Sequence, residues 1–335
     1  MEQKRIEFVD LAKGITILII ALTHTYGDSG GFALEILSIF KVPTFFALSG
    51  LFFSTYDSFN TFIRKKINQL VIPLLFTFVF FSLPWNIILE LHSGDNISVN
   101  DLIFLPDTCK LNFGMAPGAW FVLCLLFIVL FFYLIYIISC GNMVIISLVA
   151  FSAGISGYLL NVIDVSLPIW IDTALTSMPF FLMGMVLGRF SGILRSDISF
   201  TKWWMTLIIS ALIFGYSIFM LGDGSIFYAG NRYSVNLICL FIGGGAGVLL
   251  VILISKIINK LPLISFIGRY SLIMLLTHQL YLFFLRNIIY QLDIQQDNII
   301  INFILFVIVV ILTIPTILFC KKYLPWAFGL KEVIK

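Results

Sequence analysis

Two histidines and one aspartate lie in long apolar segments, where ionisable side chains are rare. His24 ends the apolar run of residues 15–22 in "ALTHTYGDSGG", and Asp10 precedes that run. Fourteen residues separate them, which on one α-helix puts both on the same face with a rise of about 21 Å. Ionisable groups at membrane depth usually face the bundle interior or a wet cavity. We expect His24 to line an internal site; the alternative is a surface histidine that hydrogen-bonds a loop.

The second histidine of this kind is His278, in "IGRYSLIMLLTHQLYLF". It lies seven residues after Ser271, and about 18 Å from the predicted start of its helix, so its depth resembles that of His24. A neutral imidazole can take a proton from a hydroxyl and return it, as acyl transfer to an alcohol requires. The alternative for His278 is a structural hydrogen bond between helices. His92 has the surroundings of a loop residue.

A basic run, Arg64, Lys65 and Lys66, precedes the third apolar segment in "FIRKKINQLVIP". Such a run usually marks the cytoplasmic side of a membrane protein. With Arg189, Arg195 and Arg269 at other predicted helix ends, it could also bind phosphate groups. Both interpretations stay open. The chain has no Walker-type phosphate loop, no H-E-x-x-H and no cysteine–histidine metal spacing, so we expect no metal cofactor.

The composition is that of an integral membrane protein. Of the 335 residues, 60% are hydrophobic and 11% charged, and the mean hydropathy is +1.08, whereas a soluble domain has about 25% charged residues. The net charge of +3 gives no support for a nucleic-acid partner. The five cysteines include no C-x-x-C pair, which favours packing roles. Asp10, Lys13 and His24 in the first apolar segment favour a spanning helix over a signal peptide.

Ten segments are long and apolar enough to cross the hydrocarbon core, which takes about 20 residues. They are residues 8–27, 35–54, 70–91, 119–139, 143–162, 173–190, 203–222, 235–255, 265–288 and 298–320. We therefore predict an all-α fold, in which residues 1–335 form one polytopic transmembrane helical bundle. Gly14 and Ala21 on the stripe of His24 would let a neighbouring helix or a narrow ligand approach, and "IGGGAG" at 242–247 predicts close helix packing.

The basic residues test this topology independently, because Lys and Arg accumulate on the cytoplasmic side. With both termini cytoplasmic, sixteen of the twenty Lys and Arg residues fall inside, and only Lys41, Lys110, Arg232 and Arg286 fall outside. Moving one span would invert every later loop and remove this bias. Two long connections, 92–118 and 222–234, are then on the outer side and could form a lid.

Six stretches resemble the membrane-bound acyltransferase family 3, and particularly its bacterial O-acetylases for fucose or exopolysaccharide. In chain order they are "RIEFVDLAKGITILIIALTHT", "KVPTFFALSGLFF", "FIRKKINQLVIPLLF", "GAWFVLCLL", "PFFLMGMVLGR" and "IGRYSLIMLLTHQ". Each stretch is weak by itself, but the ordered set extends from about residue 5 to residue 280 and is fairly specific.

This resemblance implies a ten-helix enzyme of the bacterial inner (cytoplasmic) membrane. Its acyl group, usually acetyl from acetyl-CoA, would move to a hydroxyl of a glycan or lipid-linked sugar. The family's motif positions fall on His24 and His278 as histidines, on Arg5, Asp10 and Arg64 as charged residues, and on Ser49, Gly50, Trp120 and Phe121 as residues lining the pocket. Two departures are Lys13, where many members have an arginine, and the absence of an extracytoplasmic hydrolase-like domain. Lysine cannot make the bidentate contact of arginine. The missing domain implies that the helical unit completes transfer alone or passes its product to a separate protein.

The expected mechanism places the nucleotide of acetyl-CoA at a cytoplasmic basic mouth and its pantetheine arm inside the bundle. Arg64, Lys65, Lys66, Arg189 and Arg269 would form that mouth. Arg5, Asp10 and Lys13 would serve donor binding or structure, and the thioester would meet the sugar near His24. His24 would act as general base or as transient acyl carrier.

Two other functions are compatible with such a bundle. A transporter or flippase of lipid-linked glycans would also have ionisable residues inside, and a structural membrane subunit would share the topology. No internal repeat is visible, and the ordered motifs favour the enzyme. The acceptor stays open among exopolysaccharide sugars, glycolipids, and small amino acids or antibiotics.

Overall fold

The computed structural model describes residues 6–56, 58–93, 99–105, 110–190, 192–194, 200–293 and 298–334. Within this part of the chain, ten helices are long and apolar enough to cross a membrane. This confirms the predicted helical bundle and its number of spans. The described strands form one short antiparallel hairpin, β1 (Ile226–Phe227) with β2 (Arg232–Tyr233).

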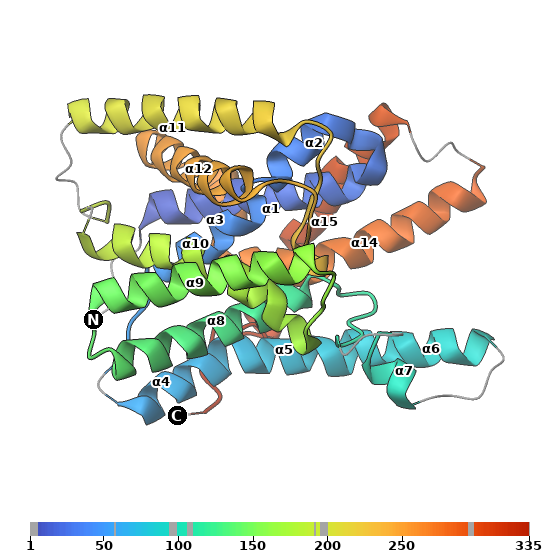
Figure 1. Cartoon of the computed structure of the whole chain (residues 1–335). Coiled ribbons are helices and arrows are strands. Elements are labelled where there is room, and N and C mark those ends of the chain that lie inside the picture. The colour runs from blue at the N-terminus through green and yellow to red at the C-terminus, as the bar shows by residue number, and fades with distance from the viewer. Residues whose placement is uncertain are drawn as a thin grey trace.

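Most spans are single helices whose long axes run roughly side by side (Figure 1). They are α1 (Glu7–Tyr26), α8 (Ala119–Ile138), α9 (Met143–Val162), α10 (Ile171–Phe190), α11 (Phe200–Leu221), α12 (Gly244–Ile258), α14 (Ser271–Gln291) and α15 (Ile299–Tyr323). The span that ends in α12 begins with a π-helical turn, Ile238–Gly243.

Two spans are interrupted, and a third starts later than predicted. The second span consists of α2 (Gly31–Ser38) and α3 (Lys41–Gly50). The third joins α4 (Phe59–Lys66), α5 (Ile72–Thr77) and α6 (Leu83–Ser93) through two π-helical segments, Ile67–Val71 and Phe78–Ser82. The ninth starts at Ser271, because the chain turns at Tyr270 after the separate helix α13 (Pro262–Arg269). A short helix, α7 (Val99–Ile103), packs beside α6.

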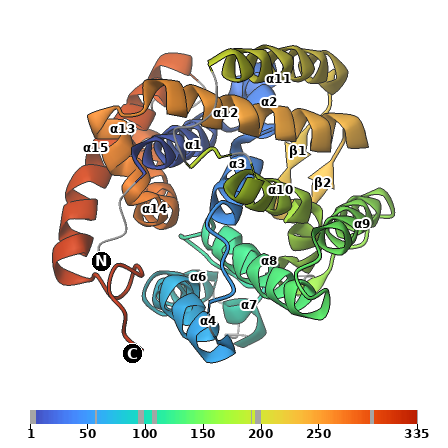
Figure 2. The same cartoon turned by 90° about the vertical axis from the view of Figure 1, so that its left-hand side faces the viewer.

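Helices α1, α3 and α10 form the inner part of the bundle, and the others surround them (Figure 2). Close approach depends on glycine. A side chain at Gly14 would overlap the carbonyl of Ile264 in α13, and one at Gly184 would overlap the carbonyl of Ala47 in α3. The glycines of the 242–247 tract likewise pack against Ser217, Phe180 and Phe40. The glycines of the 242–247 tract therefore allow close helix packing, as predicted, and of the two alternatives for Gly14 the structure shows the neighbouring helix.

The bundle has two different ends. At the end we call the histidine end, α1 stops at Tyr26, α6 at Ser93 and α14 at Gln291, and the β1–β2 hairpin lies there. Helix α1 starts at the opposite end, and the C-terminal segment also ends there (Figure 1). The charge pattern predicts that the histidine end faces outward.

Candidate active site

The two membrane histidines lie side by side although 254 residues separate them. The ring centroids of His24 and His278 are 5.3 Å apart, with the ring planes inclined by 41°. His24 lies near the end of α1, about 25 Å from its first residue, and His278 is only about 10 Å into α14. The expected 18 Å for His278 counted α13 as part of the same helix. Because α13 covers the first stretch, α14 starts deeper and His278 reaches the level of His24.

The hydrogen bond of His278 determines its tautomer. Nδ1 lies 2.8 Å from the carbonyl oxygen of Met274, one turn earlier. A carbonyl only accepts hydrogen bonds, so Nδ1 carries the proton and Nε2 has a free lone pair. This Nε2 atom is buried and has no hydrogen-bond partner among the described residues. Such a group is costly to bury without a partner, which is typical of an atom reserved for a ligand or a proton.

His24 has a different environment. Its side chain is exposed, and it opens into a cavity at the histidine end. The Gln279 amide nitrogen lies 3.2 Å from His24 Nε2. An amide nitrogen only donates, so His24 accepts at Nε2 and carries its proton at Nδ1. Gln279 therefore positions His24 from the same helix that carries His278.

The end of α1 is held in place by its cap and by α14. Gly27 follows the last helical residue with φ 50°, a left-handed conformation that glycine adopts without strain. Its N–H donates to the Thr23 carbonyl. Arg286 of α14 donates to the Thr25 carbonyl at 2.8 Å. These contacts satisfy carbonyls that a helix end leaves unpaired, and they position His24.

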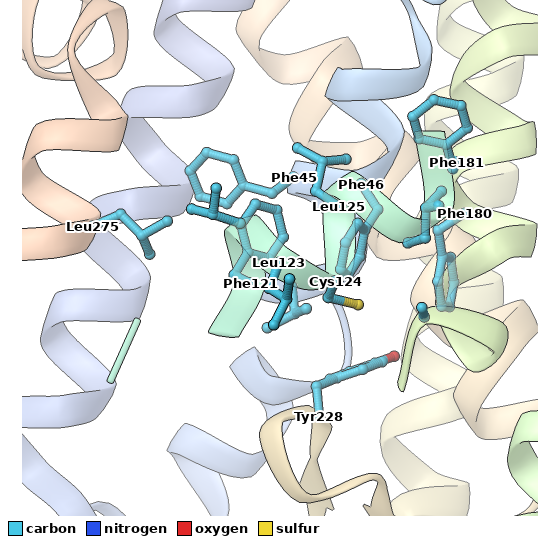
Figure 3. Close-up of a cluster of buried hydrophobic side chains, with 14 of the residues drawn as sticks. Phe45, Phe46, Phe121, Leu123, Cys124, Leu125, Phe180, Phe181, Tyr228 and Leu275 are labelled. Atoms are coloured by element: carbon cyan, nitrogen blue, oxygen red, sulfur yellow. The ribbon is translucent and has the colours of Figure 1, made fainter. Parts of the chain in front are cut away.

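The cavity between the histidines measures about 80 Å³. Its lining includes His24, His278, Lys41, Phe45, Trp120, Phe121, Tyr228 and Leu275. Phe45, Phe121 and Leu275 form an apolar wall, which continues into the buried cluster of Phe46 and Phe181 (Figure 3). Trp120 and Phe121 thus lie where the sequence placed them.

Lys41 is the cationic side chain of this cavity that the sequence analysis overlooked. Its Nζ donates to Thr23 Oγ1 at 3.0 Å, so it is attached to the same turn of α1 as His24. The sequence analysis counted Lys41 only as one of four outer basic residues. The signal was present, because Lys41 lies within the predicted second span and the rule applied to His24 also applies to it.

Ser49 and Gly50 do not line either of the two cavities at the histidine end. Ser49 donates to the Phe45 carbonyl of its own helix at 2.8 Å. Gly50 allows α3 to approach α10, since a Cβ there would overlap the Phe181 carbonyl. Both residues therefore make packing contacts, and their predicted role as pocket-lining residues stays a prediction.

The acidic residues of α1 are paired with cations at the opposite end. Asp10 lies 3.5 Å from Nε of Arg269, and Glu7 lies 3.3 Å from Nζ of Lys260 and 3.9 Å from Arg269. These ion pairs join α1 to α13 and to Lys260, which lies two residues before α13. Lys13 is half-buried on the same helix. Arg5 and Arg195 lie outside the described residues.

The basic run occupies the last turn of α4 at the opposite end. Lys65 Nζ lies 4.0 Å from the Tyr56 ring centroid and Lys66 Nζ 5.8 Å from that of Phe62. Arg64 Nε is buried and has no hydrogen-bond partner among the described residues. Beside this run, Asn68 holds the C-terminal segment, since its Oδ1 accepts from the N–H groups of Val333 and Ile334 at 2.7 and 3.0 Å.

The other candidates make their contacts elsewhere. Arg189 is exposed at the end of α10, with its guanidinium 5.0 Å from the Tyr136 ring centroid. Arg269 is engaged with α1. His92 lies exposed in the last turn of α6, where Nδ1 donates to the Ile88 carbonyl at 2.8 Å. Within the described ranges, no three His, Cys, Asp or Glu side chains gather as a metal site would require.

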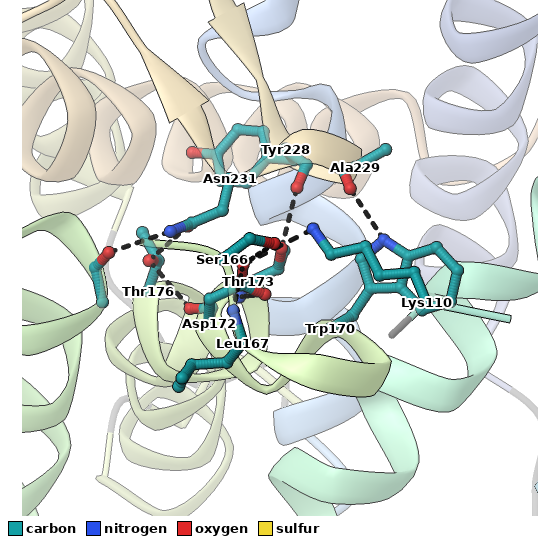
Figure 4. A network of polar contacts seen from close by, with 11 residues as sticks. Lys110, Ser166, Leu167, Trp170, Asp172, Thr173, Thr176, Tyr228, Ala229 and Asn231 are labelled. Atoms are coloured by element: carbon teal, nitrogen blue, oxygen red, sulfur yellow. Dashed lines mark hydrogen bonds and ion pairs between the residues drawn. The ribbon is translucent and has the colours of Figure 1, made fainter. Parts of the chain in front are cut away.

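A buried polar network supports the wall beside the histidine cavity (Figure 4). Lys110 Nζ lies 3.4 Å from Oδ2 of Asp172, whose side chain is fully buried at the start of α10. Ser166 Oγ and the Leu167 N–H also donate to this oxygen, both at 3.3 Å. Trp170 Nε1 donates to the Ala229 carbonyl at 2.7 Å. The network holds the segment at 110, the start of α10 and the hairpin together.

Tyr228 lines the histidine cavity and is tied to this network through its backbone. Burial raises the pKa of its hydroxyl well above the usual range, so it stays neutral at physiological pH. Its backbone carbonyl accepts from Thr173 Oγ1 at 3.0 Å, which fixes the hairpin to α10.

Comparison with known families gives one match. A family model described as an acyltransferase domain matches residues 6–319. This range contains both histidines, the basic run of α4 and the hairpin. No curated protein and no solved structure matches the chain significantly.

Proposed function

Because the chain belongs to acyltransferase family 3, we propose that it transfers an acyl group, most simply acetyl, from cytoplasmic acyl-CoA to a hydroxyl of a glycan or lipid-linked sugar. Family membership supports acyl transfer to an acceptor, and the helices make the chain a multi-pass membrane protein. The donor, the acceptor class, the bacterial inner membrane and the roles of the histidines are the proposed part.

The observation that carries the proposal is the free Nε2 atom of His278 beside His24. The buried imidazole of His278 has a fixed tautomer and an unused lone pair, so it can accept a proton from a substrate hydroxyl. The ring centroid of His24 lies 5.3 Å from that of His278, and both side chains line the same cavity. His24 Nε2 accepts from Gln279, whereas His278 Nε2 has no protein partner among the described residues, so the pair keeps one lone pair that a purely structural role would not need.

The reaction uses these groups in the following way. The acceptor hydroxyl gives its proton to an imidazole nitrogen while its oxygen attacks the thioester carbonyl carbon. The carbon–sulfur bond breaks, and the imidazolium returns the proton to the leaving thiolate, giving the ester and free coenzyme A. In the two-step alternative, His24 Nε2 leaves Gln279 and attacks the thioester carbonyl carbon, the carbon–sulfur bond breaks, and the thiolate takes the Nδ1 proton of the acylated ring. The acceptor hydroxyl then attacks the acyl carbon, the bond to Nε2 breaks, and His278 takes the hydroxyl proton and passes it to the released His24 ring.

Lys41 is suited to stabilise the charge that develops on the carbonyl oxygen. Its ammonium has three donors, and Thr23 uses one of them. The remaining donors are available to the cavity that Lys41 shares with both histidines. In a largely apolar cavity, a fixed cation is worth far more than in water.

The donor is proposed to enter from the opposite end. The unpartnered, buried Nε of Arg64 and the neighbouring Lys65 and Lys66 offer positive charge to its phosphates. The histidines lie about 25 Å along α1 from that end. The acyl arm therefore has to extend into the bundle to bring the thioester to them.

Label transfer tests this function. Purified protein in lipid nanodiscs is given radiolabelled acetyl-CoA and a cell-envelope glycan extract, and label in the glycan fraction is measured. His24→Ala should lower the rate by about 10²- to 10⁴-fold, the usual contribution of a general base. His92→Ala is the matched control and should leave the rate unchanged, because His92 lies outside the site.

Two results would contradict the proposal. Wild-type rates in His24→Ala would remove the histidine from the chemistry. Absence of covalent label in any acceptor, together with movement of lipid-linked glycan across the membrane, would favour the transporter.

The same assay distinguishes the two routes of acyl transfer. Label on His24 after incubation with the donor alone would show that the two-step route is used.

A further inference from the structure

A larger cleft adjoins the histidine cavity at the same end of the bundle. It measures about 540 Å³, which is within the range of about 300–1,000 Å³ typical of small-molecule sites. Its walls come from the segments at 110–120 and 160–170 and from the β1–β2 hairpin. Trp120, Phe227 and Ala229 line both this cleft and the histidine cavity. A ligand in the cleft can therefore extend a group toward the histidines.

The cleft has rigid walls. The buried Lys110–Asp172 pair and the Trp170–Ala229 hydrogen bond fix two of them. Asn161 of α9 fixes the hairpin through two bonds with Tyr233, at 3.0 and 3.1 Å. Such a preformed cleft binds a ligand without first having to order its own walls.

Two aromatic rings in the cleft are available to a ligand. Phe227 is 56% exposed although it belongs to a strand. Trp120 is half-buried. Both stand at the junction with the histidine cavity. Large aromatic rings offer an apolar face of fixed geometry, and exposing one next to a catalytic cavity points to a ligand with an apolar face.

Two charged side chains of opposite sign complete the cleft. Arg232 is paired in register with Phe227 across the hairpin, so both side chains lie on the same face. Asp164 lies on the facing loop after α9. Both are exposed, and neither has a side-chain partner among the described residues. Lys110 also lines the cleft, but its ammonium is paired with the buried carboxylate of Asp172. Arg232 and Asp164 therefore offer hydrogen-bond donors and acceptors with no excess of either charge.

The loop that carries Asp164 is strained. Asp164, Ile169 and Trp170 all have positive φ, at 53°, 51° and 61°. For a β-branched or bulky side chain this conformation is a genuine outlier. Strained residues persist where the surrounding structure holds them, often at functional sites. Here the strain is located along one wall of the cleft.

We propose that this cleft is the acceptor site and that it binds a carbohydrate. One face of a sugar ring would pack on Phe227 and Trp120, and its hydroxyls would bond to Asp164 and Arg232. The balanced charges argue against a phosphate group, and the charged rim argues against an acyl chain. The acceptor role rests on the proposed function; carbohydrate binding itself does not require catalysis.

Direct binding tests this inference without acyl-CoA. Methyl glycosides of glucose, galactose, mannose, fucose and N-acetylglucosamine are titrated against nanodisc-embedded protein by saturation-transfer NMR, with glycerol as the acyclic control. At least one glycoside should bind the wild type and His24→Ala alike. Phe227→Ala should raise its Kd by about tenfold or more, as for an aromatic residue at the centre of a contact. Asp164→Asn should raise the Kd of the glycoside by a smaller factor.

Matched controls come from the same chain. Phe219→Ala removes another exposed phenylalanine, 79% exposed on α11, and Asp223→Asn changes an exposed aspartate outside the cleft. Neither should change the Kd. Absence of glycoside binding, or equal loss in Phe219→Ala and Phe227→Ala, would overturn the carbohydrate cleft while leaving acyl transfer untouched. Failure of label transfer with glycoside binding intact would instead count against the proposed function.

Discussion

Ionisable side chains have different environments at the two ends of α1. At the opposite end, Glu7 and Asp10 meet cations of Lys260 and Arg269, so their charges are neutralised by protein. At the histidine end, His278 keeps a free nitrogen and Lys41 faces a cavity. Asp10 and His24 share one helix face, yet only His24 opens to a cavity. An ionisable residue inside a membrane is thus a functional candidate only until its partners are known.

A substitution of Lys41 gives the largest expected effect and tests the difference between the two ends of α1. Lys41→Met should lower kcat by about 10²- to 10³-fold, as when one donor to a developing oxyanion is removed. The donor KM should change far less, because Lys41 lies away from the basic run. Steady-state kinetics of label transfer would measure both constants.

The controls for Lys41 separate charge from structure. Lys41→Arg keeps the cation and should retain part of the activity, and Lys322→Met at the end of α15 should have no effect. An unchanged kcat in Lys41→Met would mean that the cation is structural and that the two ends differ less than we infer.

A smaller effect is expected at Arg64. Arg64→Ala should raise the donor KM by about tenfold, the loss of a charge-assisted hydrogen bond of about 1.4 kcal/mol. The kcat at saturating donor should be nearly unchanged. Binding of coenzyme A to nanodisc-embedded protein at two salt concentrations would check the affinity and its expected salt dependence.

Lys322→Ala serves as the control for a basic residue on the same predicted side of the membrane. Unaltered affinity for coenzyme A in Arg64→Ala would place the donor phosphates elsewhere.

The smallest effect is expected at Asp10. Its ion pair with Arg269 is partly exposed to solvent, and Arg269 keeps Glu7 as a second partner. Asp10→Asn should therefore lower the free energy of unfolding by about 1 kcal/mol or less, with little effect on kcat. Thermal unfolding in detergent, in a double-mutant cycle with Arg269→Gln, would measure the coupling. A fall in kcat as large as that of Lys41→Met would show that the ends are not functionally distinct.

Much of the architecture is local and could therefore be predicted. Each span is defined by its own length and apolarity, so ten were found without knowing how they pack. The interruptions were missed, because α13 and α14 form one continuous apolar stretch and only the turn at Tyr270 separates them. Trp120 and Phe121, from one motif, line the histidine cavity, whereas Ser49 and Gly50, from another motif, make packing contacts outside it.

The sequence by itself determined the membrane class, the number of spans and the family, because these follow from composition, segment length and the order of short motifs. Only the tertiary structure decided which ionisable residues meet. The turn after α13 places His278 at the same depth as His24. The hydrogen bond to Met274 leaves Nε2 of His278 free, and the position of α3 brings Lys41 to the same cavity. Contacts between residues far apart in the chain depend on how helices pack, and no local pattern encodes that.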